Sequence, residues 1–207
     1  MDTFEKLLLG EGYRFVAGVD EAGRGPLAGP VVAAAVIFPQ AYSNSAINDS
    51  KKLTAHKRDE LYKVISEEAL AVGIGVAEAD VIDRINILQA SLQAMREAVM
   101  ELSLAPDYLL VDGLYTLALP TPQKALIKGD SLSVSVAAAS IIAKVSRDRI
   151  MDIYHRQFPQ YNFHQNKGYG TLEHRKILKE IGMCKIHRRS FHVRTMNLQQ
   201  TIMVWPE

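Results

Sequence analysis

Apolar residues along the chain fall either into short continuous runs or into stripes of helical spacing, and the two kinds of pattern alternate. Short runs rich in β-branched and aromatic residues predict strands over residues 13–19, 31–38, 70–77, 107–113 and 123–127. Stripes with a period near 3.6 predict helices over residues 55–69, 79–85, 88–102, 132–158 and 172–181, with Thr54 as a cap and Gly182 as a stop. This alternation is typical of an α/β fold.

Two adjacent carboxylates, Asp20 and Glu21, follow the first predicted strand, and a glycine-rich turn comes directly after them. Successive side chains of a strand point to opposite faces, so both carboxylates can serve one site only if the strand ends or bulges there. The glycines permit such a bend, and they leave backbone N–H groups open to a ligand. We therefore expect an active-site edge of a sheet here.

Two more carboxylates stand at similar places. Asp112 ends the apolar run over residues 107–113, and Asp130 precedes the long helix predicted from residue 132. For Asp130 the helix dipole offers an ordinary structural reason, and each of the four carboxylates taken alone could simply cap a helix or a turn. Four carboxylates gathered together would instead repel one another and need cations or raised pKa values. Hard divalent cations, Mg²⁺ or Mn²⁺, suit such oxygen ligands, and two of them could assist hydrolysis of a phosphodiester.

Charge is distributed unevenly along the 207 residues. Residues 1–123 carry 10 Lys and Arg against 17 Asp and Glu, a net −7, whereas residues 124–207 carry 14 against 6, a net +8. The halves fit an acidic metal-holding part that faces a basic polyanion-holding part, although two solvated faces would give the same count. The single cysteine, Cys184, excludes an internal disulfide and a multi-thiolate metal site, and we expect it to be inert.

The composition, 48% hydrophobic and 23% charged, is that of a globular domain with no membrane-spanning run of about 20 apolar residues. The N-terminal residues lack the features of a secretory signal, so we expect a cytoplasmic protein. We expect one domain over residues 1–207, with residues 160–207 as a C-terminal appendage, and a monomer.

A competing interpretation arises from residues 23–28, which satisfy a loose Gly-x-Gly-x-x-Ala dinucleotide pattern, with Asp49 about 20 residues further on. That pattern must open a helix whose N-terminus holds pyrophosphate. Here Pro30 introduces a β-rich run, and two carboxylates stand immediately before the glycines. The context argues against a dinucleotide site.

The chain resembles ribonuclease HII, the bacterial type 2 ribonuclease H, in motifs that span nearly its whole length. The matching segments are residues 18–31 (Gly-Val-Asp-Glu-Ala-Gly-Arg-Gly-Pro-Leu-Ala-Gly-Pro-Val), 49–53, 111–113, 128–131, 139–145, 167–171 and 187–191. The resemblance implies a ribonuclease H-like fold, a mixed five-stranded sheet flanked by helices, with a helical C-terminal part that completes the substrate groove. The extra N-terminal domain of the sister family, ribonuclease HIII, is not expected.

The resemblance also implies site residues. The metal-binding carboxylates would be Asp20, Glu21, Asp112 and Asp130. The motif Gly23, Arg24 and Gly25 would recognise the ribose 2′-hydroxyl at an RNA–DNA junction, and Tyr169 would stack on the deoxyribose 3′ of the ribonucleotide. Lys51, and more weakly Lys52 and Arg188, would contact the substrate. The chemistry agrees, because a 2′-hydroxyl separates RNA from DNA at one nucleotide and exposed glycine backbone can probe it.

The resulting expectation is a metal-dependent endonuclease that uses Mg²⁺ or Mn²⁺. It would cut 5′ of a ribonucleotide, in RNA–DNA hybrids and in duplex DNA, leave 3′-hydroxyl and 5′-phosphate ends, and begin removal of misincorporated ribonucleotides. Two alternatives stay open: a non-catalytic duplex-binding protein, and a two-metal nuclease for a branched or DNA-only substrate. The tail over residues 199–205 either forms a sliding-clamp peptide or is an unstructured apolar end.

Overall fold

The computed structural model describes residues 3–47 and 53–191. Its centre is one five-stranded sheet in the order β3-β2-β1-β4-β5. The strands are β1 (Val16–Ala22), β2 (Val31–Ile37), β3 (Ala71–Ala77), β4 (Tyr108–Asp112) and β5 (Gln123–Leu126). β2 pairs antiparallel with both β1 and β3. β4 pairs parallel with β1, and β5 pairs parallel with β4. The predicted mixed five-stranded sheet of an α/β protein is confirmed.

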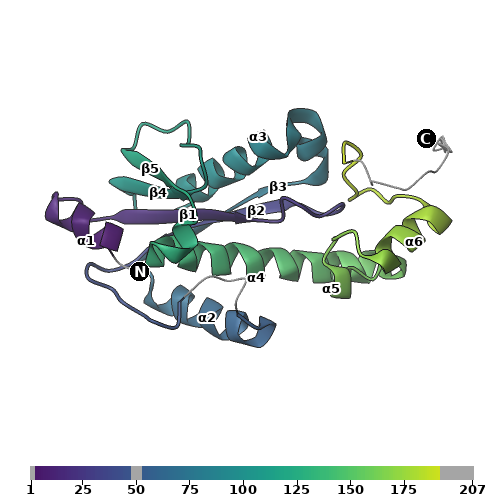
Figure 1. Ribbon diagram of the computed structural model, residues 1–207, viewed down its shortest axis with the longest axis horizontal. Helices are drawn as coiled ribbons and strands as arrows, with labels where there is room; N and C mark the ends of the chain where they lie inside the picture. Colours follow the sequence, from purple (N-terminus) through teal and green to yellow (C-terminus); the bar gives the residue numbers. More distant parts are fainter. Residues whose placement is uncertain (1–2, 48–52, 192–207) are drawn as a thin grey trace.

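Helices cover both faces of the sheet (Figure 1). The helices are α1 (Thr3–Gly10), α2 (Ala55–Glu68), α3 (Ala79–Met100), α4 (Val134–Gln157), α5 (Phe163–Asn166) and α6 (Leu172–Ile181), and the short 3₁₀ turns are η2 (Gly129–Ser131) and η3 (Pro159–Tyr161). α3 packs on one face with the core that contains Val19 and Ala33, and α2 and α4 pack on the other with Ala34 and Val36. Because β2 is buried on both faces, its sequence is continuously apolar instead of alternating.

β1 differs from its predicted extent. We expected a strand over residues 13–19 with the carboxylates at its end, but β1 begins at Val16 and contains both Asp20 and Glu21. Pairing with β2 continues to Ala22, whereas pairing with β4 stops at Val19. The strand therefore ends on one side only, and the free edge beyond Val19 gives both carboxylates access to one space.

α3 contains a break at Asn86, whose φ of 68° is left-handed. The Asn86 side-chain oxygen accepts hydrogen bonds from the backbone N–H groups of Leu88 and Gln89, so it caps the second half of the helix. The sequence predicted two helices over residues 79–85 and 88–102, which this break explains. α1, α5 and η3 were not predicted.

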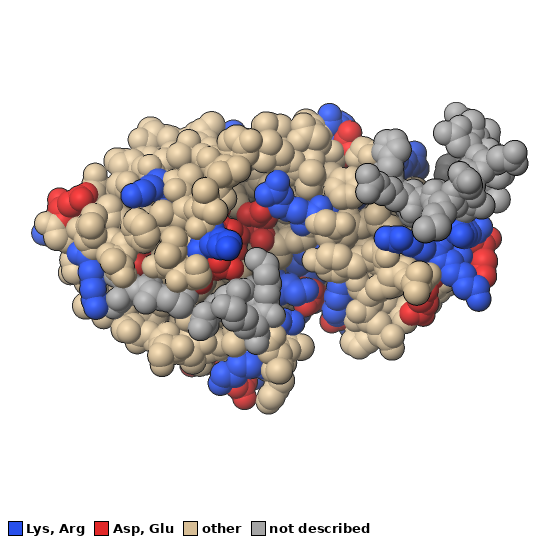
Figure 2. All heavy atoms as spheres, in the orientation of Figure 1, with Lys and Arg blue, Asp and Glu red and all other residues tan. Residues whose placement is uncertain are grey.

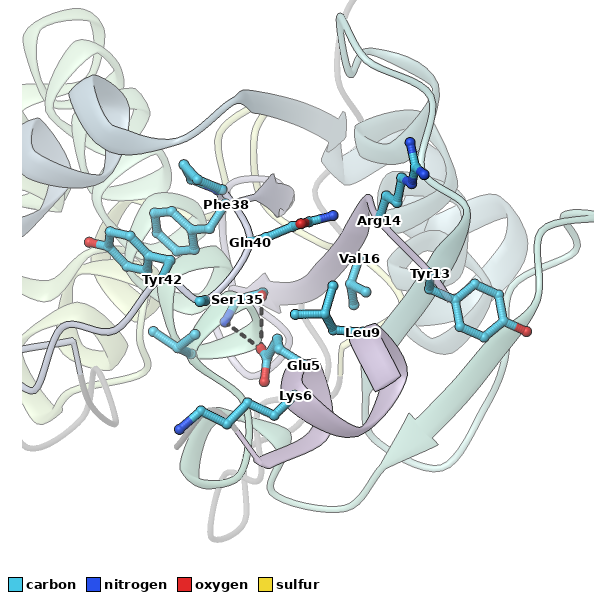
Figure 3. A pocket seen from close by; sticks show the side chains of 13 residues that line it. Glu5, Lys6, Leu9, Tyr13, Arg14, Val16, Phe38, Gln40, Tyr42 and Ser135 are labelled. Atoms are coloured by element: carbon cyan, nitrogen blue, oxygen red, sulfur yellow. Dashed lines mark hydrogen bonds between the residues drawn. The ribbon is translucent and has the colours of Figure 1, made fainter. Parts of the chain in front are cut away.

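α4 begins two residues later than predicted. The Ser133 hydroxyl caps it by accepting the Val136 N–H, and the Glu5 carboxylate of α1 accepts the Ser135 N–H at 3.1 Å and the Ser135 hydroxyl at 2.8 Å (Figure 3). These groups satisfy the helix N-terminus, whereas Asp130 lies earlier, in η2. Asp130 is therefore not the cap of α4, whose N-terminal N–H groups have other partners.

The C-terminal elements η3, α5 and α6 pack around the far half of α4 (Figure 1). Their core contains Met151, Tyr161, Phe163 and Ile186, and Ala28 from the loop between β1 and β2 joins it. The C-terminal helices are thus attached directly to the glycine-rich loop. The tail over residues 199–205 lies outside the described residues. None of the helices within the described ranges is long and apolar enough to cross a membrane.

Candidate active site

Asp20, Glu21 and Asp112 line one cavity at the end of the sheet where β1 and β4 separate. Asp20 lies on the α4 side of β1, where it is buried and accepts hydrogen bonds from the Ser140 side chain and from the Glu21 N–H. Glu21 lies beyond the last β1 residue that pairs with β4, and it forms an ion pair with Arg24 at 3.2 Å. On the face drawn in Figure 2 the molecule is hollowed between its sheet-containing part and its C-terminal helices, and acidic and basic side chains both occur along the hollow.

The three carboxylates interact electrostatically. Burial, followed by the charges of Glu21 and Asp112, raises the pKa of Asp20 well above its ordinary value. Burial also raises the pKa of Glu21, and Asp112 adds to the increase while Arg24 opposes it. The cavity therefore concentrates negative charge that nearby cations would relieve.

Asp130 lies near the same cavity, because its neighbour Gly129 contacts Asp112. The Gly129 N–H donates a 2.7 Å hydrogen bond to Oδ1 of Asp112, which ties η2 to the end of β4. Asp130 is buried beside this contact, but it is not among the residues that line the cavity with Asp20. The structure thus brings three of the four predicted carboxylates together and places the fourth next to them.

The donor set of the cavity suits a hard divalent cation. Its candidate ligands are carboxylate oxygens, and the described lining residues include neither His nor Cys. Within residues 3–47 and 53–191, no group of three or more His, Cys, Asp or Glu side chains is already arranged to hold a metal ion. The cavity therefore fits a divalent cation in its charge and in its ligand chemistry. Asp20, Glu21 and Asp112 are the groups that would hold the ion, with Asp130 beside them.

The glycine-rich loop after β1 forms one wall of the cavity, through Gly23, Arg24 and Gly25. Two fully buried arginines hold this loop from behind. Arg188 donates to the carbonyl oxygens of Gly23, Arg24 and Gly29, and Arg147 donates to those of Ala28, Pro30 and Lys167. Because these carbonyls are bound from behind, the loop is fixed where it faces the cavity.

The position of Arg188 differs from the prediction. We expected a substrate contact, but its guanidinium is 0% exposed and is engaged with three backbone carbonyls. Burial lowers its pKa to about 9, and the neighbouring Arg147 charge adds to the decrease. In this structure Arg188 supports the loop and does not reach the cavity.

Tyr169 lies opposite Gly25. The residue is 45% exposed and lines the cavity, and a Cβ added to Gly25 would lie 3.8 Å from the Tyr169 Cε1. Residues separated by 144 positions therefore form one opening. The open space beside Gly25 faces an aromatic ring.

Three further cavity residues were not predicted as site residues: Ser140 and Lys144 from α4, and Arg58 from α2. Ser140 and Lys144 are four residues apart and so share one face of a helix, which is the sequence signal that could have identified them. Lys144 also forms an ion pair with Asp148 at 2.6 Å. Lys51 and Lys52 lie outside the described residues.

Comparisons with known proteins identify the family. The family model described as Ribonuclease HII matches residues 17–194. A ribonuclease HII of Syntrophus aciditrophicus is 65% identical over 199 residues, which cover 96% of this chain and 94% of that protein.

Two solved archaeal structures share the fold. One is the ribonuclease H2 of Pyrococcus horikoshii, with a TM-score of 0.72 and 26% identity over 86% of this chain and 93% of that one. The other is a complex of PCNA with RNase HII from Archaeoglobus fulgidus, with a TM-score of 0.73 and 26% identity over 89% of this chain and 98% of that one. The chain therefore belongs to the ribonuclease HII family and is a metal-dependent endoribonuclease that acts on RNA–DNA hybrids.

Proposed function

We propose that this endoribonuclease cuts the phosphodiester bond on the 5′ side of a ribonucleotide, including a single ribonucleotide within duplex DNA. The products carry 3′-hydroxyl and 5′-phosphate ends, and the cut begins the removal of misincorporated ribonucleotides. The observation that supports this best is the meeting of Gly25 and Tyr169 at the mouth of the carboxylate cavity. The glycine-rich loop, which can sense one sugar oxygen, lies beside the carboxylates, which can hold hydrolytic metal ions.

Asp20, Glu21, Asp112 and Asp130 would hold two divalent cations, Mg²⁺ or Mn²⁺. Cations bound there would supply the chemistry of water activation and of leaving-group stabilisation at the 3′-oxygen. The protein contributes the arrangement of ligands: the Ser140 side chain and the Glu21 N–H orient the Asp20 carboxylate, and the Gly129 N–H orients that of Asp112. Such hydrogen bonds fix the orientation of each carboxylate.

The loop Gly23–Gly25 identifies the ribose. A 2′-hydroxyl both donates and accepts hydrogen bonds, so backbone amide and carbonyl groups can recognise it. Arg147 and Arg188 already bind carbonyls of residues 23–30 from behind, so the loop need not be ordered when substrate binds. This preorganisation supports discrimination at a single sugar.

Tyr169 selects the junction by packing its exposed ring on a sugar without a 2′-oxygen, on the 3′ side of the ribonucleotide. A ribose at that position would be crowded by the ring. Arg58 and Lys144 line the same cavity and bring positive charge to the phosphate backbone, and Lys51 is retained as a proposed phosphate contact. Arg188 is not assigned a substrate contact.

The test uses two matched DNA duplexes that differ in one 2′-hydroxyl, incubated with the chain and Mg²⁺. We expect a single cut 5′ of the ribonucleotide and no cut in the all-DNA duplex. Cleavage of both duplexes would instead favour a DNA-directed nuclease. Binding of both without cleavage would favour the duplex-binding protein, whose affinity would fall by about 0.9 log units per phosphate contact per log unit of salt.

A second proposal concerns partners. The solved A. fulgidus relative is in a complex with PCNA, which supports a weak sliding-clamp contact through residues 199–205. Deleting these residues should abolish co-elution with the bacterial sliding clamp while cleavage of a short duplex stays unchanged. Sedimentation of the chain alone tests whether it is a monomer, and its cytoplasmic location stays a prediction.

A further inference from the structure

Two buried histidines outside the carboxylate cavity contact each other. His174, in α6, is 0% exposed and His187 is 2% exposed, and their Nε2 atoms lie 3.0 Å apart. The nitrogen at the other side of each ring contacts backbone: His174 Nδ1 lies 2.9 Å from the Tyr169 carbonyl oxygen, and the Cys184 N–H lies 2.9 Å from His187 Nδ1. The rings therefore connect the Cys184 backbone to the Tyr169 backbone.

The backbone partners fix the protons on both rings. The Cys184 N–H can only donate, so His187 Nδ1 must accept and its proton resides on Nε2. The Tyr169 carbonyl can only accept, so His174 Nδ1 carries the proton and its Nε2 is the acceptor. The Cys184 carbonyl also lies 3.3 Å from His187 Nδ1, but an Nδ1 that accepts the Cys184 N–H carries no proton to donate to it. With both rings neutral, each hydrogen bond has one donor and one acceptor, and all run in the same direction.

The chain of hydrogen bonds ends at the backbone of the residue whose ring faces Gly25. Other contacts hold the neighbouring backbone: the Leu27 N–H donates to the Gly168 carbonyl, and the Gly168 N–H donates to the Asn166 side chain. The His187 backbone also pairs with Ala28. The Tyr169 N–H donates to the Asn166 carbonyl, and the Tyr169 carbonyl accepts the Thr171 N–H as well as the His174 ring N–H. Tyr169 is thus exposed while its main chain is held on both sides, an arrangement that suits stacking at one fixed place.

We propose that His174 and His187 are positioning residues for the sugar-reading tyrosine, acting through the one-directional chain from the Cys184 N–H to the Tyr169 carbonyl. The proposal deepens the proposed function and rests on the stacking role assigned to Tyr169. Neither histidine contacts substrate. Each acts by fixing where the Tyr169 backbone lies.

The surroundings of the pair favour its neutral form. The rings pack against Tyr161 and Phe163, and Glu173 and Cys184 are the other titratable neighbours. Burial, followed by the His174 charge, lowers the pKa of His187 to about 4, and burial lowers the pKa of His174 as well. Near neutral pH the environment therefore preserves the protonation pattern that the chain requires.

The first experiment measures the tautomers directly, by long-range ¹H–¹⁵N NMR of the full-length unmodified chain at neutral pH. We expect the Nδ1–H tautomer for His174 and the Nε2–H tautomer for His187. The opposite tautomers, or a rapid mixture of both, would overturn the proposal. This measurement does not depend on cleavage.

The second experiment compares two substitutions of one residue. Asparagine at 174 places an amide N–H near the former Nδ1 position and can still donate to the Tyr169 carbonyl, whereas leucine cannot. Both H174N and H174L leave His187 Nε2–H without its partner, so they form a matched pair. The readout is the ratio of cleavage of a single embedded ribonucleotide to cleavage of a continuous RNA–DNA hybrid, with Y169A as the reference for complete loss of the ring.

We expect H174L to lower this ratio by roughly five- to tenfold, toward that of Y169A, and H174N to stay within about twofold of the unmodified chain. Equal ratios in H174N and H174L would show a merely structural role and overturn the proposal. If H174L does not fold, H187Q and H187N replace the pair. Glutamine retains a donor near the former Nε2 position, whereas asparagine does not. The same ratio of cleavage is measured. Failure of the unmodified chain to cut at a single ribonucleotide would instead refute the proposed function, and the tautomers would still report on the hydrogen-bond chain.

Discussion

The Gly129 N–H donates a 2.7 Å hydrogen bond to Oδ1 of Asp112. This contact joins the end of β4 to the turn that carries Asp130, although the two carboxylates are 18 positions apart. One oxygen of Asp112 therefore holds the site together, in addition to the metal-binding role proposed for this carboxylate. The two tasks can be separated by substitution.

Asp112→Asn and Asp112→Ala should differ in stability but not in activity. Asparagine keeps an oxygen for the Gly129 N–H, so we expect its free energy of unfolding to stay within about 1 kcal/mol of the unmodified chain. Alanine leaves that N–H without its acceptor and should cost about 1–3 kcal/mol. Both should lose nearly all cleavage in Mg²⁺. Urea unfolding and a cleavage assay check this, and near-normal rates for Asp112→Asn would refute the role of Asp112.

Gly23→Ala and Gly25→Ala should fail for different reasons. At Gly23 the φ of +98° is left-handed, and an added Cβ would lie 2.1 Å from Arg147 Nε and 2.8 Å from the Pro30 carbonyl oxygen. We expect a loss of at least about 1–3 kcal/mol of stability there. At Gly25 the added Cβ meets only Tyr169, at 3.8 Å, so the fold should be retained while cleavage at a single ribonucleotide falls. Thermal unfolding and the embedded-ribonucleotide assay separate the two, and equal stability of both variants would contradict the argument.

Arg188→Lys should weaken the fold without changing the salt dependence of duplex binding. A lysine cannot serve three carbonyls in the geometry of a guanidinium, so we expect a loss of about 2–4 kcal/mol in the free energy of unfolding. If Arg188 instead contacted a phosphate, the slope of log affinity against log salt would fall by about 1. Urea unfolding and binding titrations at several salt concentrations distinguish these outcomes.

The stability of the protein should decrease as the pH falls from about 6.5 to about 4, in part because of His187. The pKa of His187 is about 4 in the folded protein, below the ordinary value of about 6.5 expected when the chain is unfolded. Between these values the unfolded chain binds more protons, so unfolding becomes easier as the pH drops. The contribution present above pH 6.5 is up to roughly 3 kcal/mol.

The measurement is chemical unfolding of the unmodified chain and of His187→Gln across this pH range. Buried carboxylates with raised pKa values, such as Asp20, act in the opposite direction in both proteins, so the difference between the two proteins isolates the histidine. The gap should narrow toward pH 4. A gap that is independent of pH would show that His187 does not titrate differently on folding.

Much of the fold could be predicted because its signals are local. β2 is a continuous apolar run, and α6 has a capping Thr171 and a terminal Gly182, so both could be located to within one residue. β1 was misplaced because the sequence around Asp20 does not reveal that one neighbour strand continues while the other stops. That difference is set by pairing between distant segments.

The residues of the site, too, could be predicted only where their signal is local. Asp20, Glu21 and Asp112 could be proposed because each follows an apolar strand, but the burial of Arg188 depends on where residues 184–188 pack against the loop, which no local pattern encodes. The pairing of His174 with His187 was equally out of reach, because 13 positions of loop and helix separate them.

α4 also connects three parts of the candidate site. At 24 residues the helix is about 36 Å long, and it carries Ser140 beside the carboxylates, Arg147 behind the glycine-rich loop and Met151 in the C-terminal core. Under the proposed function, this one helix would set the spacing between the carboxylates and the loop and ring that contact the sugar. A ribonucleotide would then be recognised by its distance from the bond to be cut.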